Sequence, residues 1–497
     1  MENILSRHCI HPDMILHEHD PESGNLVKTY NRDEFLQLID RWKVFLVENY
    51  DVQPGQTIAM ELAPGLIYYA LAFAAAELGL IFIIDWPLCY KERDLEDPKV
   101  TMWGEIDYIV SHTHHEQSCH VKGNQSWSEW THQRNLKFGK TFIYENTMFE
   151  YNMNSSRRIT EIINTIHATP DTPLINFCSS GTTGTPKKLM NTHGKVYRIA
   201  KRMTGLNFTK GLKILNFNNL HHGASMTYHF VPTFMVGSEL YTAIGCHGPT
   251  ELGIDGVVKF ILEHKLNQMF LYRMDHVEYF LRNMPRVDWT VNITTLLQIT
   301  PEMINLIKEK NVNWIVSPFG DTSIGQAIFN KKVNQTTDLA TYDVTNQGRP
   351  VDDFYQVEVR DGSLWVAIPK LNQEWRTSGD AFEVMDGDFY FRGRANQYRI
   401  NKEWIVLGDI ETAVNTIFGR GGANIVIDFE MQKVYLAVWQ PDSEAEEKIN
   451  KFFEDNYKKV KIDYVLRDED YNQFYNSRKI DNSKIREVCR ENILKGK

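Results

Sequence analysis

A run of small and hydroxylated residues follows an apolar segment at residues 174–178. The run consists of Ser179, Ser180, Gly181, Thr182, Thr183, Gly184 and Thr185. Its hydroxyls and glycine backbone N–H groups can offer many hydrogen-bond donors to a polyphosphate, and Lys187 adds a positive charge. A Walker A loop is excluded because GxxxxGK followed by Ser or Thr is absent. The run therefore predicts a phosphate-binding loop, with a flexible connection between two elements as the alternative.

This run is similar to the TSGTTGxPKG loop of the acyl-adenylate-forming (AMP-binding) superfamily. That superfamily includes acyl-CoA synthetases, peptide-synthetase adenylation domains and luciferases. Lys188 stands where the motif ends in Gly. The resemblance extends over nearly the whole chain, through further motifs in the family's order. It implies ATP and Mg²⁺ as cofactors and the activation of a small-molecule carboxylic acid as its acyl-adenylate.

A second motif, residues 319–323, resembles the family's aromatic-Gly-x-Thr-Glu segment. The resemblance implies that Phe319 flanks the adenine, that Thr322 is a catalytic residue at the α-phosphate, and that Gly320 borders the substrate acid. Ser323 replaces the Glu that helps to hold magnesium in relatives, and a serine supplies no carboxylate to a hard cation. The magnesium ligands are therefore not assigned.

A third motif, Ser378-Gly379-Asp380, resembles the family's Thr-Gly-Asp segment. The resemblance implies that Asp380 binds the ribose, because a carboxylate can accept hydrogen bonds from both ribose hydroxyls. Ser-Gly-Asp is also an ordinary turn sequence. Arg394, in a Gly-Arg pair, matches the arginine that precedes the family's hinge, and the resemblance implies contact with the ribose or a phosphate.

Residues 477–486 resemble the family's Gly-Lys-Ile-x-Arg segment, with Arg478 at the usual Gly. The resemblance implies that Lys479 enters the active site with the small domain. A lysine between the carboxylate and the α-phosphate would neutralise charge as the reacting oxygens approach. Taken alone, a lysine in a charged tail is more often a solvated residue.

Residues 218–225 match the region where relatives line the acyl pocket, and His222 is the candidate wall residue. A buried structural histidine is the alternative. We find no Asp here of the kind that binds an α-ammonium group, so an aliphatic or aromatic acid is favoured over an amino acid. The expected acyl acceptor is CoA or a separate pantetheine carrier protein.

Two alternatives to a working ligase remain at this stage. A nucleotide-binding protein that has lost catalysis is favoured by four departures from the family's motifs: Ser323, Lys188, Arg478, and Lys402 with Glu403 near a usual Gly. Luciferase-like oxygenation uses the same scaffold.

Predicted helices and strands, which must position these residues, alternate along the early part of the chain. Helical apolar spacing over residues 32–49 is followed by a turn at 53–55 and a short strand at 57–62. Residues 66–84 predict a buried helix, a Gly turn and a buried strand, with a membrane span as the weaker alternative. Further strands are predicted at residues 174–178, 213–217 and 314–320. Such strand–helix–strand units build parallel sheets.

The pattern changes after residue 394. A helix is predicted at 409–418, strands around 424–429 and 433–439, and a charged helix at 442–459 with a capping box of Ser443 and Glu446. We therefore predict an α/β fold with two domains. Residues 1–394 form a large N-terminal domain of mixed sheets with flanking helices that binds ATP and the acid, and residues 395–497 form a small, mobile α+β lid domain.

Residues 90–155 predict a polar surface insertion. This stretch holds His112, His114, His115, Cys119 and His120, for which metal binding is the alternative, although the spacing fits no standard zinc pattern.

The composition indicates a globular protein of more than one domain: 497 residues, 42% hydrophobic and 24% charged. The net charge of -10 and a pI near 6.0 do not show the basic charge balance that is typical of proteins that bind nucleic acid. The six scattered cysteines predict reduced thiols. With no apolar segment of a signal peptide at the N-terminus and no expected membrane span, we predict a cytoplasmic protein.

Overall fold

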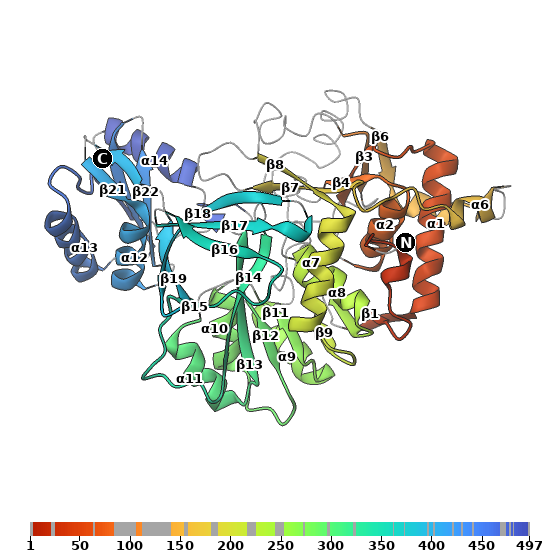
Figure 1. Cartoon of the computed structure of the whole chain (residues 1–497), viewed down its shortest axis with the longest axis horizontal. Coiled ribbons are helices and arrows are strands. Elements are labelled where there is room, and N and C mark those ends of the chain that lie inside the picture. The colour runs from red at the N-terminus through yellow and green to blue at the C-terminus, as the bar shows by residue number, and fades with distance from the viewer. Residues whose placement is uncertain are drawn as a thin grey trace. The chain divides into compact units, whose positions relative to one another are not determined.

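A computed structural model of the chain divides into two compact units. The first comprises Met1–Pro318 and Lys332–Tyr342, and the second comprises Phe319–Lys331 and Asp343–Lys497. The structure describes residues 3–20, 25–62, 65–83, 106–111, 141–153, 158–179, 187–215, 225–243, 253–271, 274–295, 299–321, 325–360, 362–371, 373–394, 397–400, 403–419, 422–428, 431–439, 442–467, 474–476, 479–480 and 482–495. Figure 1 shows the element order along the chain.

The first unit contains a six-stranded sheet in the order β6-β5-β3-β4-β7-β8. Its strands are β3 (Thr57–Glu61), β4 (Ile81–Ile83), β5 (Tyr108–Ser111), β6 (Thr141–Tyr144), β7 (Pro173–Ser179) and β8 (Lys187–Thr192). All neighbours pair in parallel except β7 and β8, which are antiparallel. The predicted parallel sheet is therefore confirmed, and β8 reverses direction at its edge.

The prediction of a polar surface insertion over residues 90–155 is wrong for β5 and β6. Ile109, Val110 and Ile143 are fully buried and complete the sheet. Short buried strands inside a polar stretch carry too few apolar residues for a periodic signal. The predicted histidine and cysteine cluster of residues 112–120 lies outside the described residues.

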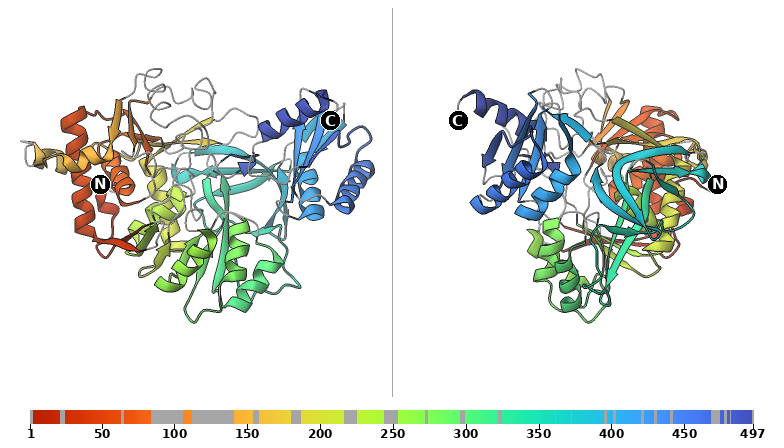
Figure 2. Two further views of the ribbon diagram at one scale, coloured as in Figure 1. Left: turned by 180° about the vertical axis from the view of Figure 1, so that it is seen from behind. Right: turned by 60° about the vertical axis from the view of Figure 1, so that its left-hand side comes forward.

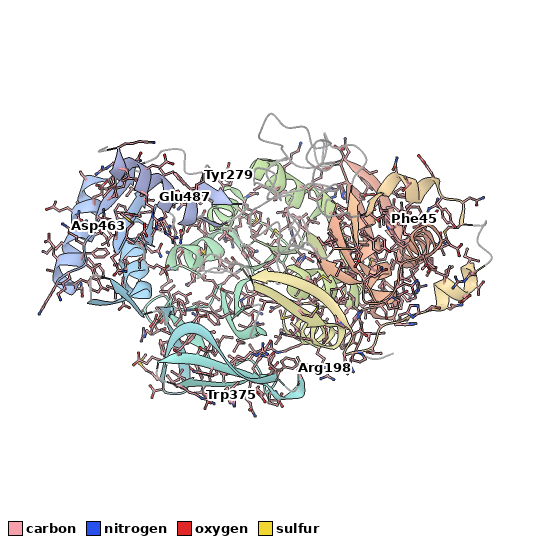
Figure 3. The ribbon with its side chains drawn as sticks, turned by 90° about the horizontal axis from the view of Figure 1, so that it is seen from above. Phe45, Arg198, Tyr279, Trp375, Asp463 and Glu487 are labelled. Carbon is pink, nitrogen blue, oxygen red and sulfur yellow. The ribbon has the colours of Figure 1, made fainter. Side chains whose placement is uncertain are left out.

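Two helices cover this sheet and explain the apolar sequence of the early chain. In α1 (Arg32–Tyr50), Asn31 accepts from the Glu34 N–H at 3.0 Å and the Glu34 carboxylate accepts from the Asn31 N–H at 3.0 Å. This reciprocal capping starts the helix. α2 (Leu66–Glu77) is buried all round, as expected of a core helix. Figure 3 shows Phe45 among the dense side chains around α1.

The helix, turn and strand predicted over residues 66–84 are confirmed by α2 and β4. Among the described residues, none of the helices is long and apolar enough to span a membrane.

An eight-stranded sheet follows the order β14-β13-β12-β11-β9-β10-β1-β2. Its strands are β1 (Ile15–His19), β2 (Leu26–Asn31), β9 (Lys213–Leu215), β10 (Glu239–Ala243), β11 (Gln268–Phe270), β12 (Asn292–Thr294), β13 (Trp314–Asp321) and β14 (Gly325–Asn334). The strands from β1 through β10, β9, β11 and β12 to β13 pair in parallel. This is the second layered sheet that the alternating pattern predicts.

The two faces of this sheet pack against different helices. Ile214 and Leu240 pack with α7 (His193–Leu206), the π-helix η4 (Ser225–Phe230) and α8 (Val231–Met235). The next residues along these strands, Leu215 and Tyr241, pack with α9 (Gly253–His264), α10 (Met274–Asn283) and α11 (Pro301–Lys310). Successive residues of a strand thus pack against helices on opposite faces of the sheet, as the pleated backbone requires.

The second unit contains an antiparallel sheet that the sequence did not predict. Its order is β15-β19-β18-β17-β16. The strands are β15 (Asn346–Gly348), β16 (Gln356–Arg360), β17 (Ser363–Ile368), β18 (Gln373–Met385) and β19 (Asp388–Arg394).

The rest of the second unit has helices on both faces of a small sheet, β22-β23-β24. The strands are β22 (Ala423–Asp428), β23 (Lys433–Val438) and β24 (Tyr464–Arg467), and the helices are α12 (Leu407–Phe418), α13 (Ser443–Asn456) and α14 (Asn482–Leu494). α12 and α13 pack on one face and α14 on the other, as Figures 1 and 2 show. The predicted helix and hairpin after residue 394 are confirmed.

Two details of the charged helix α13 differ from the prediction. The helix ends at Asn456, and its cap is Asp442, whose carboxylate accepts from the N–H groups of Glu444 and Ala445. Ser443 is the first helical residue, so the predicted Ser443 capping box is wrong. The predicted domain boundary at residue 394 falls between β19 and β20 (Gln397–Ile400) and stays a prediction.

Acidic pH is expected to destabilise the fold through three buried histidines. Burial lowers the pKa of His19 and His193 to about 4 and that of His229 to about 3. In the unfolded chain these groups bind protons near pH 6.5, so their contribution to stability is complete above that value. It is lost as the pH falls toward 4, by up to about 1.4 kcal/mol per pH unit for each histidine.

Urea unfolding followed by circular dichroism between pH 7.5 and 5 measures this loss. His19→Phe, which fits the aromatic surroundings of Tyr241 and Phe260, is expected to flatten the pH dependence. The exposed His8→Gln variant serves as the control. Equal slopes for all three proteins would contradict the assignment.

Candidate active site

The predicted phosphate loop connects the two strands of a hairpin. In β7 and β8, Cys178 lies opposite Lys188 and Ser179 lies opposite Lys187. The register therefore brings Ser179 and Lys187, the two ends of the predicted loop, next to each other. The remaining predicted phosphate ligands lie outside the described residues: Ser180, Gly181, Thr182, Thr183, Gly184 and Thr185.

The base of this hairpin is fixed at the start of α7. The His193 N–H donates to the Thr172 carbonyl at 3.1 Å, and the Gly194 N–H donates to the Pro170 carbonyl at 2.8 Å. His193 Nδ1 also accepts from the N–H of Leu5 at 3.2 Å. The N-terminal segment, the entry to β7 and the exit from β8 are thus joined at one point.

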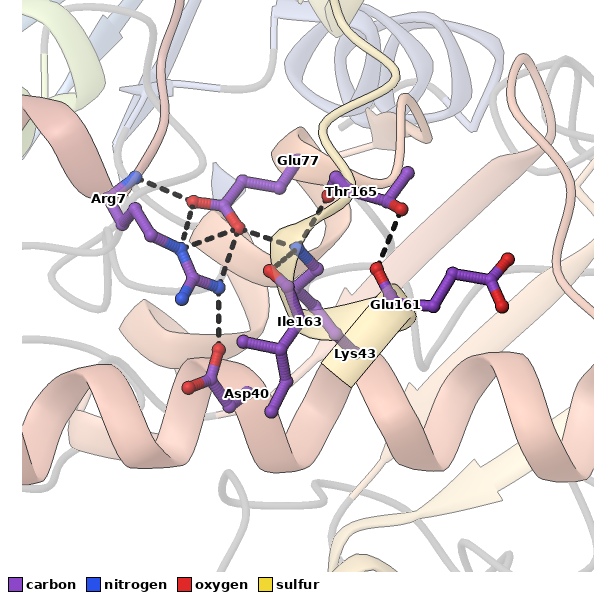
Figure 4. Close-up of polar contacts among 7 residues, drawn as sticks. All are labelled: Arg7, Asp40, Lys43, Glu77, Glu161, Ile163 and Thr165. Atoms are coloured by element: carbon purple, nitrogen blue, oxygen red, sulfur yellow. Dashed lines mark hydrogen bonds and ion pairs between the residues drawn. The ribbon is translucent and has the colours of Figure 1, made fainter. Parts of the chain in front are cut away.

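A buried charge network holds the helices beside the hairpin (Figure 4). The side chains of Lys43 and Glu77 are fully buried, and their Nζ and Oε2 atoms lie 2.9 Å apart. Lys43 Nζ also donates to the carbonyl oxygens of Ile163 and Thr165 at 2.9 and 2.7 Å. These three acceptors match the three donors of an ammonium group. The network therefore ties α1 and α2 to the segment that leads into β7.

Arg7 completes the network from the N-terminal segment. Its guanidinium binds both carboxylate oxygens of Glu77, with Nε–Oε1 and Nη2–Oε2 distances of 2.9 and 2.8 Å, and its Nη2 lies 2.6 Å from Asp40 Oδ1. Burial opposes ionisation of Glu77, but the hydrogen bonds from Arg7 and the charge of Lys43 outweigh it and hold the pKa of Glu77 below its usual value. We did not foresee this pairing, although the lone Glu77 in an apolar helix was its signal.

In the second unit, Phe319 belongs to a group of aromatic rings. Its ring centroid lies 5.1 Å from that of Phe382 in an edge-to-face arrangement, and 5.9 and 5.8 Å from those of Phe329 and Phe391. Phe319 is only half buried, whereas Phe382 is buried. Such a ring is held in place on one side and retains accessible surface, as stacking on a base requires. The adjacent Gly320 is exposed.

The structure brings Asp380 and Arg394 together. They lie directly opposite each other on the antiparallel strands β18 and β19. Gly379 precedes Asp380 with a φ of +73°, which glycine adopts readily, and the Asp380 N–H donates to Ser378 Oγ at 3.0 Å. The Ser-Gly-Asp segment is therefore a locally fixed irregularity of β18, where the register with β17 shifts, and its role toward ribose stays a prediction.

Phe382 connects the two groups of predicted nucleotide ligands. It lies two residues after Asp380 and opposite Phe391 on β19, and its ring contacts both Phe319 and Phe391. Phe319, Asp380 and Arg394 thus belong to one packed region of the second unit. The predicted ligands Thr322 and His222 lie outside the described residues, as does Ser323, which replaces the family's Glu.

Lys479 begins the two-residue strand β26 (Lys479–Ile480), which pairs with β25 (Tyr475–Asn476). The helix that follows, α14, is fixed by Arg490, whose Nε and Nη2 lie 2.5 and 2.6 Å from the two oxygens of the buried Asp428. Burial opposes ionisation of Asp428, but the hydrogen bonds from Arg490, the Met431 N–H and Tyr435 hold its pKa at about 2. This ion pair anchors the element next to Lys479 and was missed from the sequence, because its members lie far apart in the chain.

Comparison with known proteins agrees with these observations. Residues 25–271 match the family model described as AMP-binding enzyme. The acyl-CoA ligase candidate YdaB of Bacillus subtilis (strain 168) is 25% identical over 198 residues, which are 38% of this chain and 36% of that protein. The match thus spans about a third of the length of that relative.

Solved structures share the fold over almost the full chain. McyG A-PCP in complex with phenylalanyl-adenylate has a TM-score of 0.73 at 13% identity and covers 99% of this chain and 97% of that chain. O-succinylbenzoate coenzyme A synthetase from Bacillus subtilis, in complex with ATP and magnesium ion, has a TM-score of 0.66 at 15% identity and covers 97% and 98%. The predicted α/β fold is therefore confirmed, and the predicted likeness to AMP-binding enzymes is confirmed over residues 25–271.

Proposed function

We propose that this chain activates a carboxylic acid with ATP, releases pyrophosphate, and then transfers the acyl group to the thiol of CoA or of a separate pantetheine carrier protein. The observation that carries the proposal is the strand register that places Asp380 opposite Arg394, on the strands β18 and β19 whose Phe382 and Phe391 rings contact Phe319. A carboxylate for the ribose hydroxyls, a guanidinium for an anionic oxygen and an aromatic ring for the base together form a nucleotide-binding set.

In the first step, one carboxylate oxygen of the acid bonds to the α-phosphorus of ATP. The bond from that phosphorus to the bridging oxygen breaks, and pyrophosphate leaves with the electron pair. Two anions must meet, so the work of the protein is to position them and neutralise their charge. We assign polyphosphate binding to the hairpin residues Ser179 to Lys187, the α-phosphate contact to Thr322, and charge neutralisation to Lys479.

In the second step, a thiolate sulfur bonds to the acyl carbon and AMP leaves. We assign a hinge to the segment after Arg394, where the predicted small domain begins. A rotation there would withdraw Lys479 and admit the acceptor.

Magnesium fits this chain as an ion carried by the nucleotide. Among the described residues, no group of three or more His, Cys, Asp or Glu side chains is arranged to hold a metal ion. Mg²⁺ commonly keeps several waters and binds substrate phosphates, and there it would offset the negative charge of the triphosphate. Ser323 has no carboxylate, which agrees with a magnesium ion that takes few ligands from the protein.

A protein that binds ATP without turnover is the second candidate. Departures from the family's motifs favour it, among them Lys188, Ser323 and Arg478. It predicts ATP binding without acid-dependent exchange.

Exchange of labelled pyrophosphate into ATP tests the proposal, because it requires the reversible first step alone. The panel should hold aliphatic and aromatic acids, together with o-succinylbenzoate, anthranilate and phenylalanine, the acids named in neighbouring structures. Exchange with at least one acid is expected. ATP binding with no exchange across the panel would leave the second candidate.

The same assay tests the nucleotide ligands. Asp380→Asn is expected to raise the KM for ATP about tenfold, because a neutral amide accepts hydrogen bonds from ribose less strongly than a carboxylate. The control is Asp353→Asn, an exposed carboxylate paired with Lys370 in the same unit. An unchanged KM in Asp380→Asn would remove Asp380 from the nucleotide site.

A further inference from the structure

Helix α14 lies against strand β22, which holds it at three points (Figure 1). Val426 of β22 belongs to the apolar cluster that contains Ile485 and Cys489 of α14. Two residues later on the same face of the strand, the buried carboxylate of Asp428 binds the guanidinium of Arg490. These two contacts fix the middle and the later part of the helix.

The third point of attachment is a hydrogen bond at the start of the helix. The Nδ2 group of Asn424 donates to Oδ1 of Asn482 at 2.8 Å, and Asn482 is the first residue of α14. Asn424 precedes Val426 by two positions, so the period of the strand places both side chains on the face that carries α14. A polar residue in the apolar strand β22 therefore secures the end of the helix that follows Lys479.

The hairpin that contains Lys479 depends on its neighbours for its position. Among the described residues, β25 and β26 form a two-stranded sheet of their own, in which Asn476 lies opposite Lys479. Each strand has two residues. An isolated two-stranded hairpin is marginally stable at best in water. Contacts on either side must therefore hold this hairpin in place within the second unit.

Both ends of the hairpin are attached to the region of the small sheet. Phe474, directly before β25, is 1% exposed, and its ring stacks on that of Trp439 with centroids 5.6 Å apart. On the other side, Asn482 follows Lys479 by three residues and is bound by Asn424. Three residues of extended chain span at most about 11 Å, so a fixed Asn482 limits how far the backbone of Lys479 can move.

We propose that Asn424 is a positioning residue for Lys479: by binding Asn482 it holds the hairpin of residues 475–480, so that the lysine meets the reacting oxygens in one fixed place. This inference rests on the proposed adenylation and on the role assigned there to Lys479. A misplacement of about 1 Å can slow a reaction about 100-fold. The bond lies at the protein surface, so its loss should leave the fold intact.

Acid-dependent pyrophosphate exchange in the full chain tests this role. Asn424→Ala is expected to lower the maximal rate about tenfold and to leave the KM for ATP within about twofold. Asn482→Ala breaks the same bond from the other side and should give the same loss, and the double variant should lose no more than either single variant.

Asn456→Ala is the matched control. It removes an amide hydrogen bond of the same kind, from Asn456 Nδ2 to the Phe452 carbonyl, on helix α13. That helix packs on the opposite face of the small sheet from α14. Wild-type exchange is expected in this variant, and a tenfold loss would overturn the specific role of Asn424.

The Lys479→Met background separates positioning from a general structural defect. There Asn424→Ala is expected to change the residual exchange rate by less than about twofold, because the group that Asn424 positions has been removed. An equal loss in both backgrounds, or no loss with Lys479 present, overturns the role of Asn424 and leaves the proposed function standing.

The remaining outcomes distinguish this inference from the proposed function. No exchange by the wild-type chain with any acid overturns both. Wild-type exchange in Lys479→Met overturns this inference alone, because the lysine would then have no role to be positioned for. If circular dichroism shows that Asn424→Ala does not fold, the same comparison of Asn482→Ala in the two backgrounds decides.

Discussion

Replacing Lys479 with methionine is expected to slow acid-dependent pyrophosphate exchange at least about 100-fold. Methionine keeps most of the length of the side chain but removes its charge. The negative charge on the approaching carboxylate and the α-phosphate is then no longer offset, and this charge is greatest in the transition state. Equilibrium binding of ATP, measured by calorimetry, should change by only a few fold, because a group that acts mainly in the transition state adds little to ground-state affinity.

Lys484→Met is the matched control for this variant. Lys484 is an exposed residue of α14, five positions further along the same charged segment. Its replacement removes one positive charge from the same helix region without touching the proposed chemistry. Wild-type exchange in both variants would show that the charge of Lys479 plays no part in adenylation. A common loss in both would assign the effect to the net charge of the segment.

The second large effect is expected for stability. Glu77→Gln should lower the free energy of unfolding of the first unit by about 3–5 kcal/mol. The amide keeps the shape of the side chain but leaves the buried Lys43 ammonium without its charge partner and weakens both contacts with Arg7. Lys43→Met should cost less, because Glu77 stays paired with Arg7.

Urea unfolding at pH 7.5, followed by circular dichroism, measures these changes. The control is Glu161→Gln, because the pair Arg158–Glu161 is exposed at 58% and 64% of its side-chain surfaces, and its loss should leave the midpoint unchanged. A double variant, Glu77→Leu with Lys43→Met, should recover part of the lost stability, since it removes both buried charges. A midpoint of Glu77→Gln equal to that of wild type would contradict the role of the network.

Local patterns predicted the elements whose apolar residues repeat regularly. α1, β3, α2 and β4 follow the helical and strand periods of residues 32–84, and β7 precedes the Gly/Ser/Thr run as expected. β18 had no such signal. Of its 13 residues only Phe382 is fully buried, so the strand lacks the apolar alternation that marks a half-buried strand.

The candidate site was predicted as a set of residue types and not as a set of contacts. Asp380 and Arg394 were each found by their motif, but their opposition depends on the register of β18 and β19, which no local rule fixes. Lys43 and Glu77 lie 34 positions apart, and their pairing requires α1 and α2 to be packed together. The cap of α13 shows the same limit at short range: Asp442 and Ser443 are both good capping residues, and only the backbone geometry selects Asp442.

The path of the chain between the two units bears on how this protein can be divided. β13 and β14 each begin in one unit and end in the other, so the polypeptide passes from one unit to the other three times, at residues 318/319, 331/332 and 342/343. No single cut releases a whole unit. A fragment that starts at Asp343 would lack Phe319 and Phe329, and the rings of Phe382, Phe389 and Phe391 would lose their packing partners. Expression trials of the second unit must therefore rejoin residues 319–331 to it by a designed linker.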